Sequence, residues 1–359
     1  IKIYNTHCCG EIGDVVVSGD IKLEGETIFE QSKYLFENKT LRNFLLNEPR
    51  GGVFKHCNLI VPPRNNKASA GFIIMEPEDN PPMSGSNSIC VATVLIEKNF
   101  VEINEPLTEF ILEAPGGLIS IKAEVKNKIT KSVEIENLPS FVDMLDVKLK
   151  TQNFGEIIIS TVFGGDTFII CNAKDFNLTI EPKNAKKFVE ISKEIIKIAN
   201  QEFGFSHPTI PSLDYISFCQ FIEPVKINSS QQKEGWNTVS IRPGKLDRSP
   251  CGTGTSARLA LMKQKNEIDI NETFISRSII GSTFEAKIKE EFVSNNKKMI
   301  NDGLIEVVVD DVAVDEEERI FLEALGVGLD DAQSIRDERQ AQEQSTLAAA
   351  GFNFDSYTF

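Results

Sequence analysis

The sequence predicts an α+β protein built from two domains. Segments with the short apolar runs or the alternation typical of strands outnumber those with helical periodicity. Consecutive strands in 108–141 and 157–173 are separated by short turns with Gly or Asn, which indicates antiparallel neighbours. This pattern favours α+β over a doubly wound parallel sheet. The length of 359 residues fits two domains of ordinary size.

The elements are predicted in order along the chain. A helix over 26–52 ends at a Pro-Arg-Gly-Gly turn, and a second helix covers 184–204. Two apolar helical runs follow the polar stretches that end at Ser88 and Ser256. The predicted strands are 15–25 with its turn, 58–63, 69–79, a meander over 108–141, two strands around Gly164–Gly165, 214–224, 237–243, and 277–293 with a break at Gly281.

The composition excludes several classes of partner. The formal net charge of −15 argues against nucleic acid and against an anionic membrane surface, because both require clustered Lys and Arg. No apolar run reaches the roughly 18 residues that a membrane span needs. The first residues lack the layout of a secretory signal, so we expect a cytoplasmic protein.

The cysteines are expected to be reduced thiols. No CxxC pair occurs, which argues against a structural zinc site, and we expect no metal. Cys8 and Cys9 are adjacent, and on a strand their side chains would point to opposite faces, so packing is the expected role. The seven cysteines are Cys8, Cys9, Cys57, Cys90, Cys171, Cys219 and Cys251.

Two short motifs resemble each other. Ser84-Gly85-Ser86 and Cys251-Gly252-Thr253 each combine a nucleophilic residue, a glycine and a hydroxyl residue before an apolar run. They lie 167 residues apart (251 − 84), close to half the chain, which predicts two related halves. The Gly-Thr run after Cys251 lacks the Gly-Lys-Ser/Thr ending of a nucleotide-binding loop.

Paired helix starts would suit chemistry at the Cα of an amino acid. Unpaired backbone N–H groups at a helix start can hold a carboxylate, and the helix dipole favours negative charge there. The same position is expected to lower the pKa of the Cys251 thiol. Two such ends facing each other would place one side chain on each face of Cα, an arrangement for proton transfer without a cofactor. Alternatively, both motifs are ordinary helix caps.

Together these stretches resemble the proline racemase family, in particular its branch of trans-3-hydroxy-L-proline dehydratases and hydroxyproline epimerases. The resemblance runs from about residue 5 to about residue 295. It implies a two-domain fold like that of diaminopimelate epimerase, no cofactor, and a homodimer. The carrying motifs include "HCCGEIGDVV", "LRNFLLNEPRGGVF", "FIIMEPEDNPPMSGSNSICVATVLIE", "LEAPGGLI", "FGGDTF" and "DRSPCGTGTSARLA".

The resemblance also implies roles for individual residues. The family's second catalytic cysteine falls on Cys251, and its first falls on Ser84. The position of the acidic residue that contacts the ring nitrogen falls on Asp247. The amides that bind the carboxylate are implied at Gly85, Ser86, Gly252 and Thr253, with Ser86 standing where true racemases have a histidine.

Serine at position 84 predicts a changed reaction. A hydroxyl is a far weaker acid than a thiol, and none of the three imidazoles, His7, His56 and His207, is close to Ser84 in sequence. We therefore expect loss of efficient proline racemisation and dehydration of trans-3-hydroxy-L-proline to Δ1-pyrroline-2-carboxylate instead. The sequence does not assign the group that removes the Cα proton.

Three alternatives accompany this prediction. They are a 4-hydroxyproline 2-epimerase or proline racemase, a non-catalytic amino-acid binding protein, and a thiol hydrolase using Cys251 with a histidine. The predicted halves are 1–150 with Ser84 and 151–310 with Cys251, with N-terminal strands that cross over between them. An acidic tail over 311–359 is expected to be helical or disordered, and the family pattern is lost from about Asp302.

Overall fold

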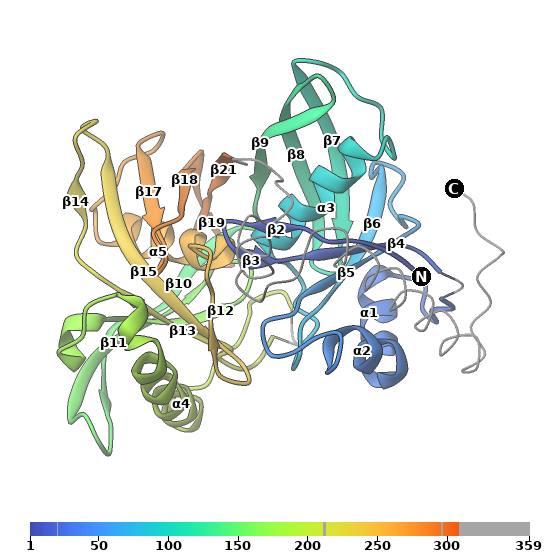
Figure 1. Cartoon of the computed structure of the whole chain (residues 1–359). Helices are drawn as coiled ribbons and strands as arrows, with labels where there is room; N and C mark the ends of the chain where they lie inside the picture. Colours follow the sequence, from blue (N-terminus) through green and yellow to red (C-terminus); the bar gives the residue numbers. More distant parts are fainter. Residues whose placement is uncertain (20, 211–212, 296, 309–359) are drawn as a thin grey trace, which may run out of the picture.

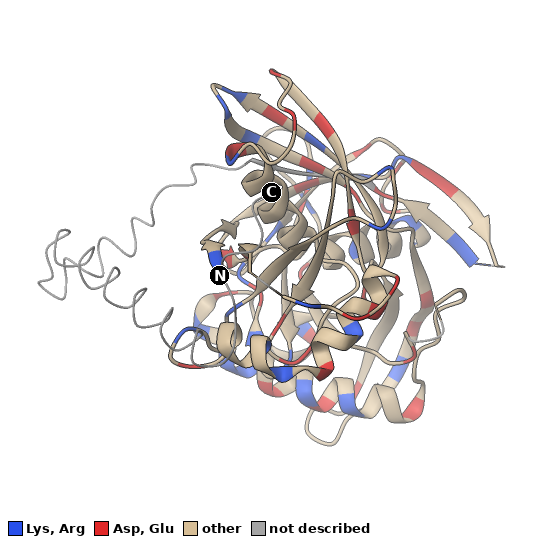
Figure 2. Cartoon of the chain, turned by 90° about the vertical axis from the view of Figure 1, so that its right-hand side faces the viewer, with Lys and Arg blue, Asp and Glu red and all other residues tan. Residues whose placement is uncertain are grey.

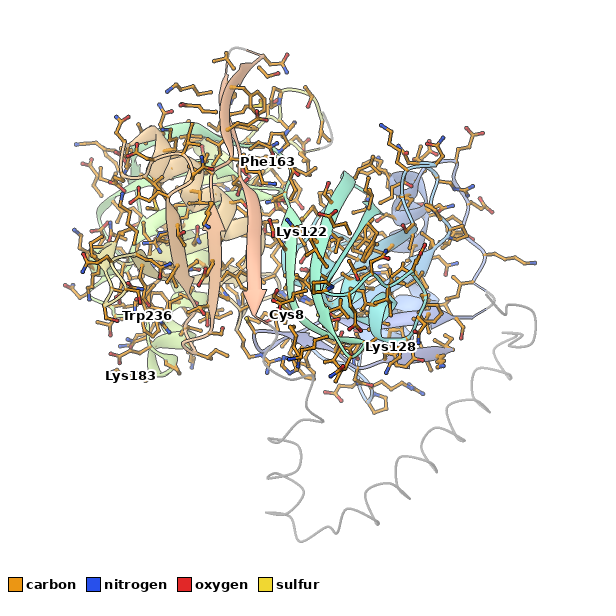
Figure 3. The ribbon with its side chains drawn as sticks, turned by 90° about the horizontal axis from the view of Figure 1, so that it is seen from above. Cys8, Lys122, Lys128, Phe163, Lys183 and Trp236 are labelled. Atoms are coloured by element: carbon orange, nitrogen blue, oxygen red, sulfur yellow. The ribbon has the colours of Figure 1, made fainter. Side chains whose placement is uncertain are left out.

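The computed structural model describes residues 1–19, 21–210, 213–295 and 297–308, without the side chains of 303–308. Two groups of strands lie next to each other and each curls around one helix (Figure 1). From above, Trp236 and Lys183 lie on one side and Lys122 and Lys128 on the other, with Cys8 between them (Figure 3). The predicted α+β class is confirmed. The predicted tail lies outside the described residues.

The first group of strands surrounds the helix that follows Ser84. A short hairpin of β2 (His7–Cys8) and β3 (Glu11–Ile12) packs against that helix. In the order of hydrogen bonding, the strands are β1 (Lys2–Tyr4), β4 (Asp14–Ser18), β5 (Cys57–Val61), β6 (Ala70–Met75), β7 (Leu107–Ala114), β8 (Gly117–Lys126) and β9 (Ile129–Glu136).

The second group surrounds the helix that follows Cys251. Short strands β14 (Lys226–Ile227) and β16 (Lys245–Leu246) pair with its strand β15 (Lys233–Ile241). In order, its strands are β18 (Thr283–Lys287), β17 (Thr273–Arg277), β15 (Lys233–Ile241), β13 (Phe218–Ile222), β12 (Thr167–Asn172), β11 (Glu156–Phe163), β10 (Ser140–Lys150), β20 (Lys297–Asn301) and β19 (Glu290–Ser294).

One strand joins the two groups. β21 (Gly303–Val308) pairs antiparallel with β9 on one side and with β18 on the other. The strand begins where the family pattern was predicted to end, so this part of the chain still completes the sheet. The predicted division at residue 150 stays a prediction. In the structure, that residue ends β10, whose partners are β11 and β20.

The two groups repeat one topology. The pairs β4–β5, β5–β6, β6–β7 and β7–β8 are parallel, antiparallel, parallel and antiparallel. The pairs β12–β13, β13–β15, β15–β17 and β17–β18 follow the same sequence of directions. In both groups a single helix connects the two strands of the second parallel pair, β6 with β7 and β15 with β17. The repeat agrees with the prediction of related halves from the two similar motifs.

The two central helices are buried along nearly their whole length. Residues 85–96 of α3 (Gly85–Glu97) and residues 252–262 of α5 (Gly252–Gln264) are all buried. A helix without a polar face is stable only inside a core. Both helices contribute to one apolar core that continues from one strand group into the other. Burial of these apolar helices therefore places their starts inside the molecule.

Outer helices cover the strand groups. α1 (Ile28–Glu37), α2 (Lys39–Leu46) and α4 (Ala185–Glu202) are amphipathic, and two 3₁₀ turns lie at Ala173–Phe176 and Pro182–Asn184. Blue and red segments are interspersed on the outer strands and helices (Figure 2). None of the described helices is long and apolar enough to cross a membrane.

Two predicted elements are wrong in extent. The helix predicted over 26–52 is two helices, because Asn38 leaves the helical conformation and its side chain accepts a hydrogen bond from Thr40 N. The strand predicted over 277–293 has its predicted break at Gly281, which lies at φ +91°, but the part after the break is two strands, β18 and β19.

The predicted geometry of Cys8 and Cys9 is also wrong. β2 ends at Cys8, and Cys9 lies in the hairpin turn at φ +51°. The two side chains are in contact through a hydrogen bond. This hydrogen bond, followed by burial, raises the pKa of the Cys8 thiol. All seven cysteines are free thiols, as expected.

Candidate active site

The starts of α3 and α5 meet at the centre of the molecule. A Cβ atom on Gly85 would lie 2.9 Å from Gly252 Cα, closer than non-bonded carbons approach. Helix starts carry backbone N–H groups without helical partners. The contact between two glycines therefore brings two sets of such donors, and two positive dipole ends, to one place.

Ser84 occupies the cap position of α3 but does not cap it with its side chain. Its hydroxyl makes no hydrogen bond to the backbone of the first helical turn. Instead, Ser84 Oγ accepts a hydrogen bond of 2.9 Å from Asn87 Nδ2 and lies 3.5 Å from Ser86 Oγ. The interpretation of this motif as an ordinary helix cap does not describe its geometry.

Cys251 occupies the corresponding position of α5. Its backbone has φ +64°, a conformation that is costly for a residue with a Cβ atom. The backbone N–H of Gly254 donates to Cys251 Sγ at 3.4 Å, and Thr253 Oγ1 lies 3.6 Å from the sulfur. In this conformation Cys251 lies on the wall of a pocket.

The expected low pKa of the Cys251 thiol is wrong. Burial, followed by the negative charge of Asp247, raises this pKa well above its ordinary value, and the hydrogen bonds from Thr253 and Gly254 do not offset the increase. The prediction considered the helix dipole alone. In the unliganded protein, Cys251 is therefore a thiol rather than a thiolate at neutral pH.

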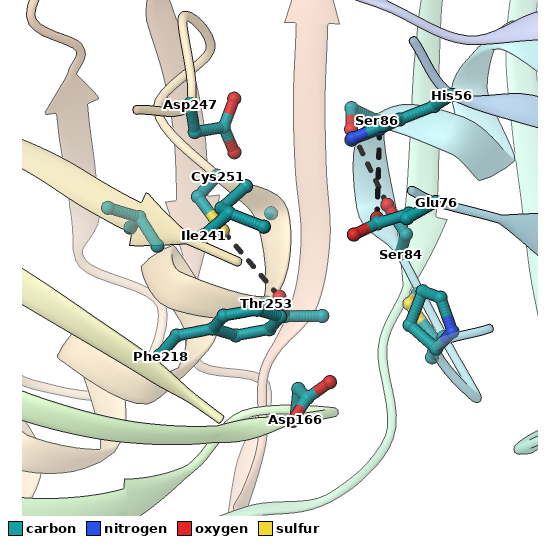
Figure 4. A pocket seen from close by; sticks show the side chains of 14 residues that line it. His56, Glu76, Ser84, Ser86, Asp166, Phe218, Ile241, Asp247, Cys251 and Thr253 are labelled. Carbon is teal, nitrogen blue, oxygen red and sulfur yellow. Dashed lines mark hydrogen bonds and ion pairs between the residues drawn. The ribbon is translucent and has the colours of Figure 1, made fainter. Parts of the chain in front are cut away.

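Most of the predicted site residues line one pocket. Ser84, Ser86, Asp247, Cys251, Gly252 and Thr253 are on its wall, and Gly85 lies at the contact of the two helices. Figure 4 shows Ser84 and Ser86 on one side of the pocket and Cys251, Asp247 and Thr253 on the other. The structure thus brings all seven together, and their roles remain predictions.

The rest of the wall is apolar except for His56, Glu76 and Asp166. Pro81, Met83, Phe218, Val239 and Ile241 form the apolar part, which suits the methylene groups of a small ring. Within the described part of the chain, no cluster of His, Cys, Asp and Glu has a geometry that could hold a metal ion.

Two carboxyl groups of the second strand group face the pocket. Asp247 Oδ1 accepts hydrogen bonds of 2.9 Å from Ser249 N and Ser249 Oγ. Burial and the negative charge of Glu11 raise the pKa of Asp247 well above its usual range. Burial also raises the pKa of Asp166 to about 6. A cationic amine in the pocket would favour ionisation of both groups.

The sequence prediction missed a buried network beside Ser84. His56 precedes β5 and Glu76 follows β6, and both line the pocket. His56 Nε2 lies 2.8 Å from Lys245 Nζ, and its Nδ1 lies 3.6 Å from Glu76 Oε1. Lys245 also pairs with Glu11. Burial and the positive charge of Lys245 lower the pKa of His56 to about 3, so this imidazole is neutral.

The other two histidines lie elsewhere. His7 belongs to the β2–β3 hairpin, and the ring of His207 packs edge-on against Phe163. Only His56 of the three lines the pocket. A sequence signal did exist for its neighbour Glu76, because this acidic residue directly follows the apolar run "FIIM" and precedes Ser84 by eight residues (84 − 76).

An ion pair and a hydrogen bond join the two strand groups through Asp79. Asp79 follows β6 in the first strand group, and its Oδ2 lies 2.7 Å from Arg242 Nη2 and accepts a hydrogen bond of 3.0 Å from Tyr215 Oη. Arg242 follows β15 in the second group. These contacts hold the loop before Ser84 against the second strand group.

Comparison with solved structures defines the class of fold. A phenazine biosynthesis protein of the PhzF family from Bacillus anthracis matches with a TM-score of 0.51 at 13% identity over 86% of this chain and 98% of that one. At that identity the match shows the fold alone. The predicted two-domain fold with curled sheets around central helices is confirmed.

The family follows from closer matches. The family model described as proline racemase matches residues 3–305, so the chain belongs to the proline racemase family. It is similar to a hydroxyproline epimerase from Agrobacterium vitis with bound trans-4-hydroxy-L-proline, at 33% identity and a TM-score of 0.79 over 86% of this chain and 93% of that one. A probable proline racemase from Agrobacterium radiobacter with bound carbonate matches at 34% identity and a TM-score of 0.79 over 87% and 93%.

Proposed function

We propose that this protein dehydrates trans-3-hydroxy-L-proline to Δ1-pyrroline-2-carboxylate, without a cofactor. The observation that carries the proposal is the asymmetry of the pocket, in which the Cys251 thiol faces the Ser84 hydroxyl. The substrate carboxylate binds at the N–H groups where α3 and α5 meet. Its ring amine binds at Asp247.

One thiol is sufficient for this reaction. In trans-3-hydroxy-L-proline, the hydroxyl and the Cα proton are on the same face of the ring. Cys251 takes the Cα proton as a thiolate, the C3–O bond breaks, and the same thiol returns a proton to the departing hydroxide as water. The enamine that remains isomerises to the imine by gaining a proton at C3 and losing one from nitrogen.

Binding of the substrate supplies the thiolate. The pKa of Cys251 is raised by burial and by the charge of Asp247. A cationic amine next to Asp247 neutralises that charge and attracts a thiolate, so both effects lower the pKa of the thiol in the complex. The thiolate therefore forms where the Cα proton is presented.

Ser84 is unsuited to act as the base on the opposite face. Its Oγ already accepts a hydrogen bond from Asn87 Nδ2. The neutral His56 makes no hydrogen bond to Ser84 in the structure, so no imidazole is placed to take the hydroxyl proton. Racemisation by two equivalent bases is accordingly not the function proposed.

A second candidate is epimerisation of 4-hydroxyproline at Cα. It is favoured by the bound trans-4-hydroxy-L-proline in the similar epimerase from Agrobacterium vitis. The same carboxylate and amine contacts would hold this substrate. Inversion requires a proton donor on the face opposite Cys251, which dehydration does not.

Proton NMR in deuterated buffer tests these functions. Trans-3-hydroxy-L-proline, trans-4-hydroxy-L-proline and L-proline are incubated separately with the protein. We expect loss of the 3-hydroxyproline signals and growth of those of the pyrroline carboxylate. Deuterium exchange at Cα of 4-hydroxyproline without dehydration of the 3-hydroxy compound would replace the first proposal by the second. No reaction with any substrate would favour a binding protein.

A further inference from the structure

Glu76 carries a buried carboxyl group that the proposed mechanism of dehydration does not use. It follows β6, its residue is 6% exposed, and it lines the pocket. Figure 4 shows its carboxyl group next to Ser84, on the side of the pocket opposite Cys251 and Asp247. The group therefore faces the same space as the thiol, but from the other side.

The carboxyl group of Glu76 makes no hydrogen bond among the described residues, and its Oε1 lies 3.6 Å from His56 Nδ1. Its backbone is held, since Glu76 N donates to Asp79 O at 2.8 Å and Glu76 O accepts from Arg42 Nη2 at 2.7 Å. Among the described residues, neither carboxyl oxygen makes a hydrogen bond, and no Lys or Arg forms an ion pair with it. A rigid backbone thus presents a free carboxyl group to the pocket.

Glu76 is protonated at neutral pH. Burial raises the pKa of this carboxyl group to about 8. The negative charges of Asp79, Glu11 and Asp166 act in the same direction, and the positive charge of Lys245 opposes them. A neutral carboxylic acid has one proton to donate.

His56 can stabilise the Glu76 carboxylate that remains once that proton has left. An ammonium group can only donate, so the 2.8 Å contact with Lys245 Nζ favours the tautomer of the neutral His56 ring that carries its proton on Nδ1. Asn87 Nδ2 also lies 3.4 Å from that nitrogen. Nδ1 is the nitrogen 3.6 Å from Glu76 Oε1. A movement of about 0.6 Å would bring the two atoms to hydrogen-bond distance.

We propose that Glu76 is the second proton-transfer group of this site and takes the place of a second thiol. The assignment rests on the proposed role of Cys251. Cys251 removes the Cα proton from one face, and the backbone amides stabilise the charge that develops on the carboxylate. The O–H bond of Glu76 then breaks and its proton bonds to the opposite face of Cα, which inverts that carbon.

The two reactions of the site are therefore separable. Inversion converts the Cys251 thiolate to a thiol and the Glu76 acid to a carboxylate, and both return by proton exchange with solvent. In the reverse direction the Glu76 carboxylate is the base and the Cys251 thiol is the acid. Dehydration takes place on the face of Cys251 alone and does not use Glu76.

Glu76→Gln tests the assignment, because the amide keeps the size of the side chain but cannot donate an acidic proton. The substrate is trans-4-hydroxy-L-proline in deuterated buffer. Chiral chromatography measures inversion, and NMR measures deuterium at Cα of the uninverted substrate. We expect inversion to fall about 100-fold or more. Exchange with retention, and dehydration of trans-3-hydroxy-L-proline, should change by less than about threefold.

Asp166→Asn is the matched control, since Asp166 is another buried carboxyl group on the pocket wall but lies in the second strand group. Its Oδ1 accepts from Thr167 N at 2.7 Å. We expect this variant to change inversion and exchange to the same extent. In the unaltered protein, inversion should decrease as the pH rises above about 8, because Glu76 loses its proton.

Four results would overturn the assignment. Inversion and exchange that fall together in Glu76→Gln would indicate a structural or binding role, and unchanged inversion would indicate another donor. Dehydration without any inversion by the unaltered protein would refute the proton-transfer role of Glu76 but would support the proposed dehydration. The absence of every reaction in the unaltered protein would refute both proposals.

Discussion

Gly85→Ala tests the contact between the two helix starts. The added Cβ would lie 2.9 Å from Gly252 Cα and 3.4 Å from Ile135 Cδ1. Carbon atoms pack at about 3.5–4.0 Å, so the helix starts must separate by about 0.6–1.1 Å. A misplacement of about 1 Å at a reacting centre can cost about 100-fold in rate. We therefore expect kcat/KM for dehydration to fall about 10- to 100-fold.

The fold should tolerate this substitution. Alanine has a higher helix propensity than glycine by about 1 kcal/mol, which offsets part of the cost of the contact. Thr93→Ala is the control, since this buried residue of α3 lies away from the cleft and its Oγ1 donates to Ile89 O at 2.9 Å. It should lower the melting temperature while kcat/KM stays within about twofold. Full activity of Gly85→Ala would refute the reasoning.

Two further variants address the charges and nucleophiles of the site. Ser84→Cys should raise deuterium exchange and inversion at Cα of proline and 4-hydroxyproline, because a thiol would then face each side of Cα; unchanged rates by NMR would count against this two-face arrangement. Asp247→Asn should speed alkylation of Cys251 by iodoacetamide in the substrate-free protein once the pH is high enough to ionise the carboxyl group of Asp247, whose own pKa is raised. Loss of that negative charge lowers the pKa of the thiol. Peptide mass spectrometry measures the rate from pH 7 to 10, where it should rise with pH as thiolate forms; a slower reaction than in the unaltered protein would contradict this electrostatic explanation.

Local patterns were enough to predict the α+β class and most of the strands. Alternation and turn residues define β7–β9, and the paired motifs identified the starts of α3 and α5. The break at Asn38 was missed because the apolar residues on both sides fit one continuous helix, whereas a single side-chain hydrogen bond decides where the first helix ends. The spacing of apolar residues carries no signal for such a local hydrogen bond.

The site was predicted in its motifs but not in its surroundings. His56 and Lys245 lie 189 residues apart, and only the packing of the two strand groups brings them to 2.8 Å. The pKa of Cys251 was predicted in the wrong direction for the same reason. The helix start is visible in the sequence, whereas burial and the approach of Asp247 are properties of the assembled cleft.

The central claim is that the Cys251 thiol removes the Cα proton. Its most direct test is the rate at which Cys251→Ser dehydrates trans-3-hydroxy-L-proline, with circular dichroism and thermal unfolding measured on the same sample. We predict that turnover is abolished while the spectrum and the melting temperature are retained. Near-normal turnover by the folded variant would contradict the assignment of Cys251 as the base.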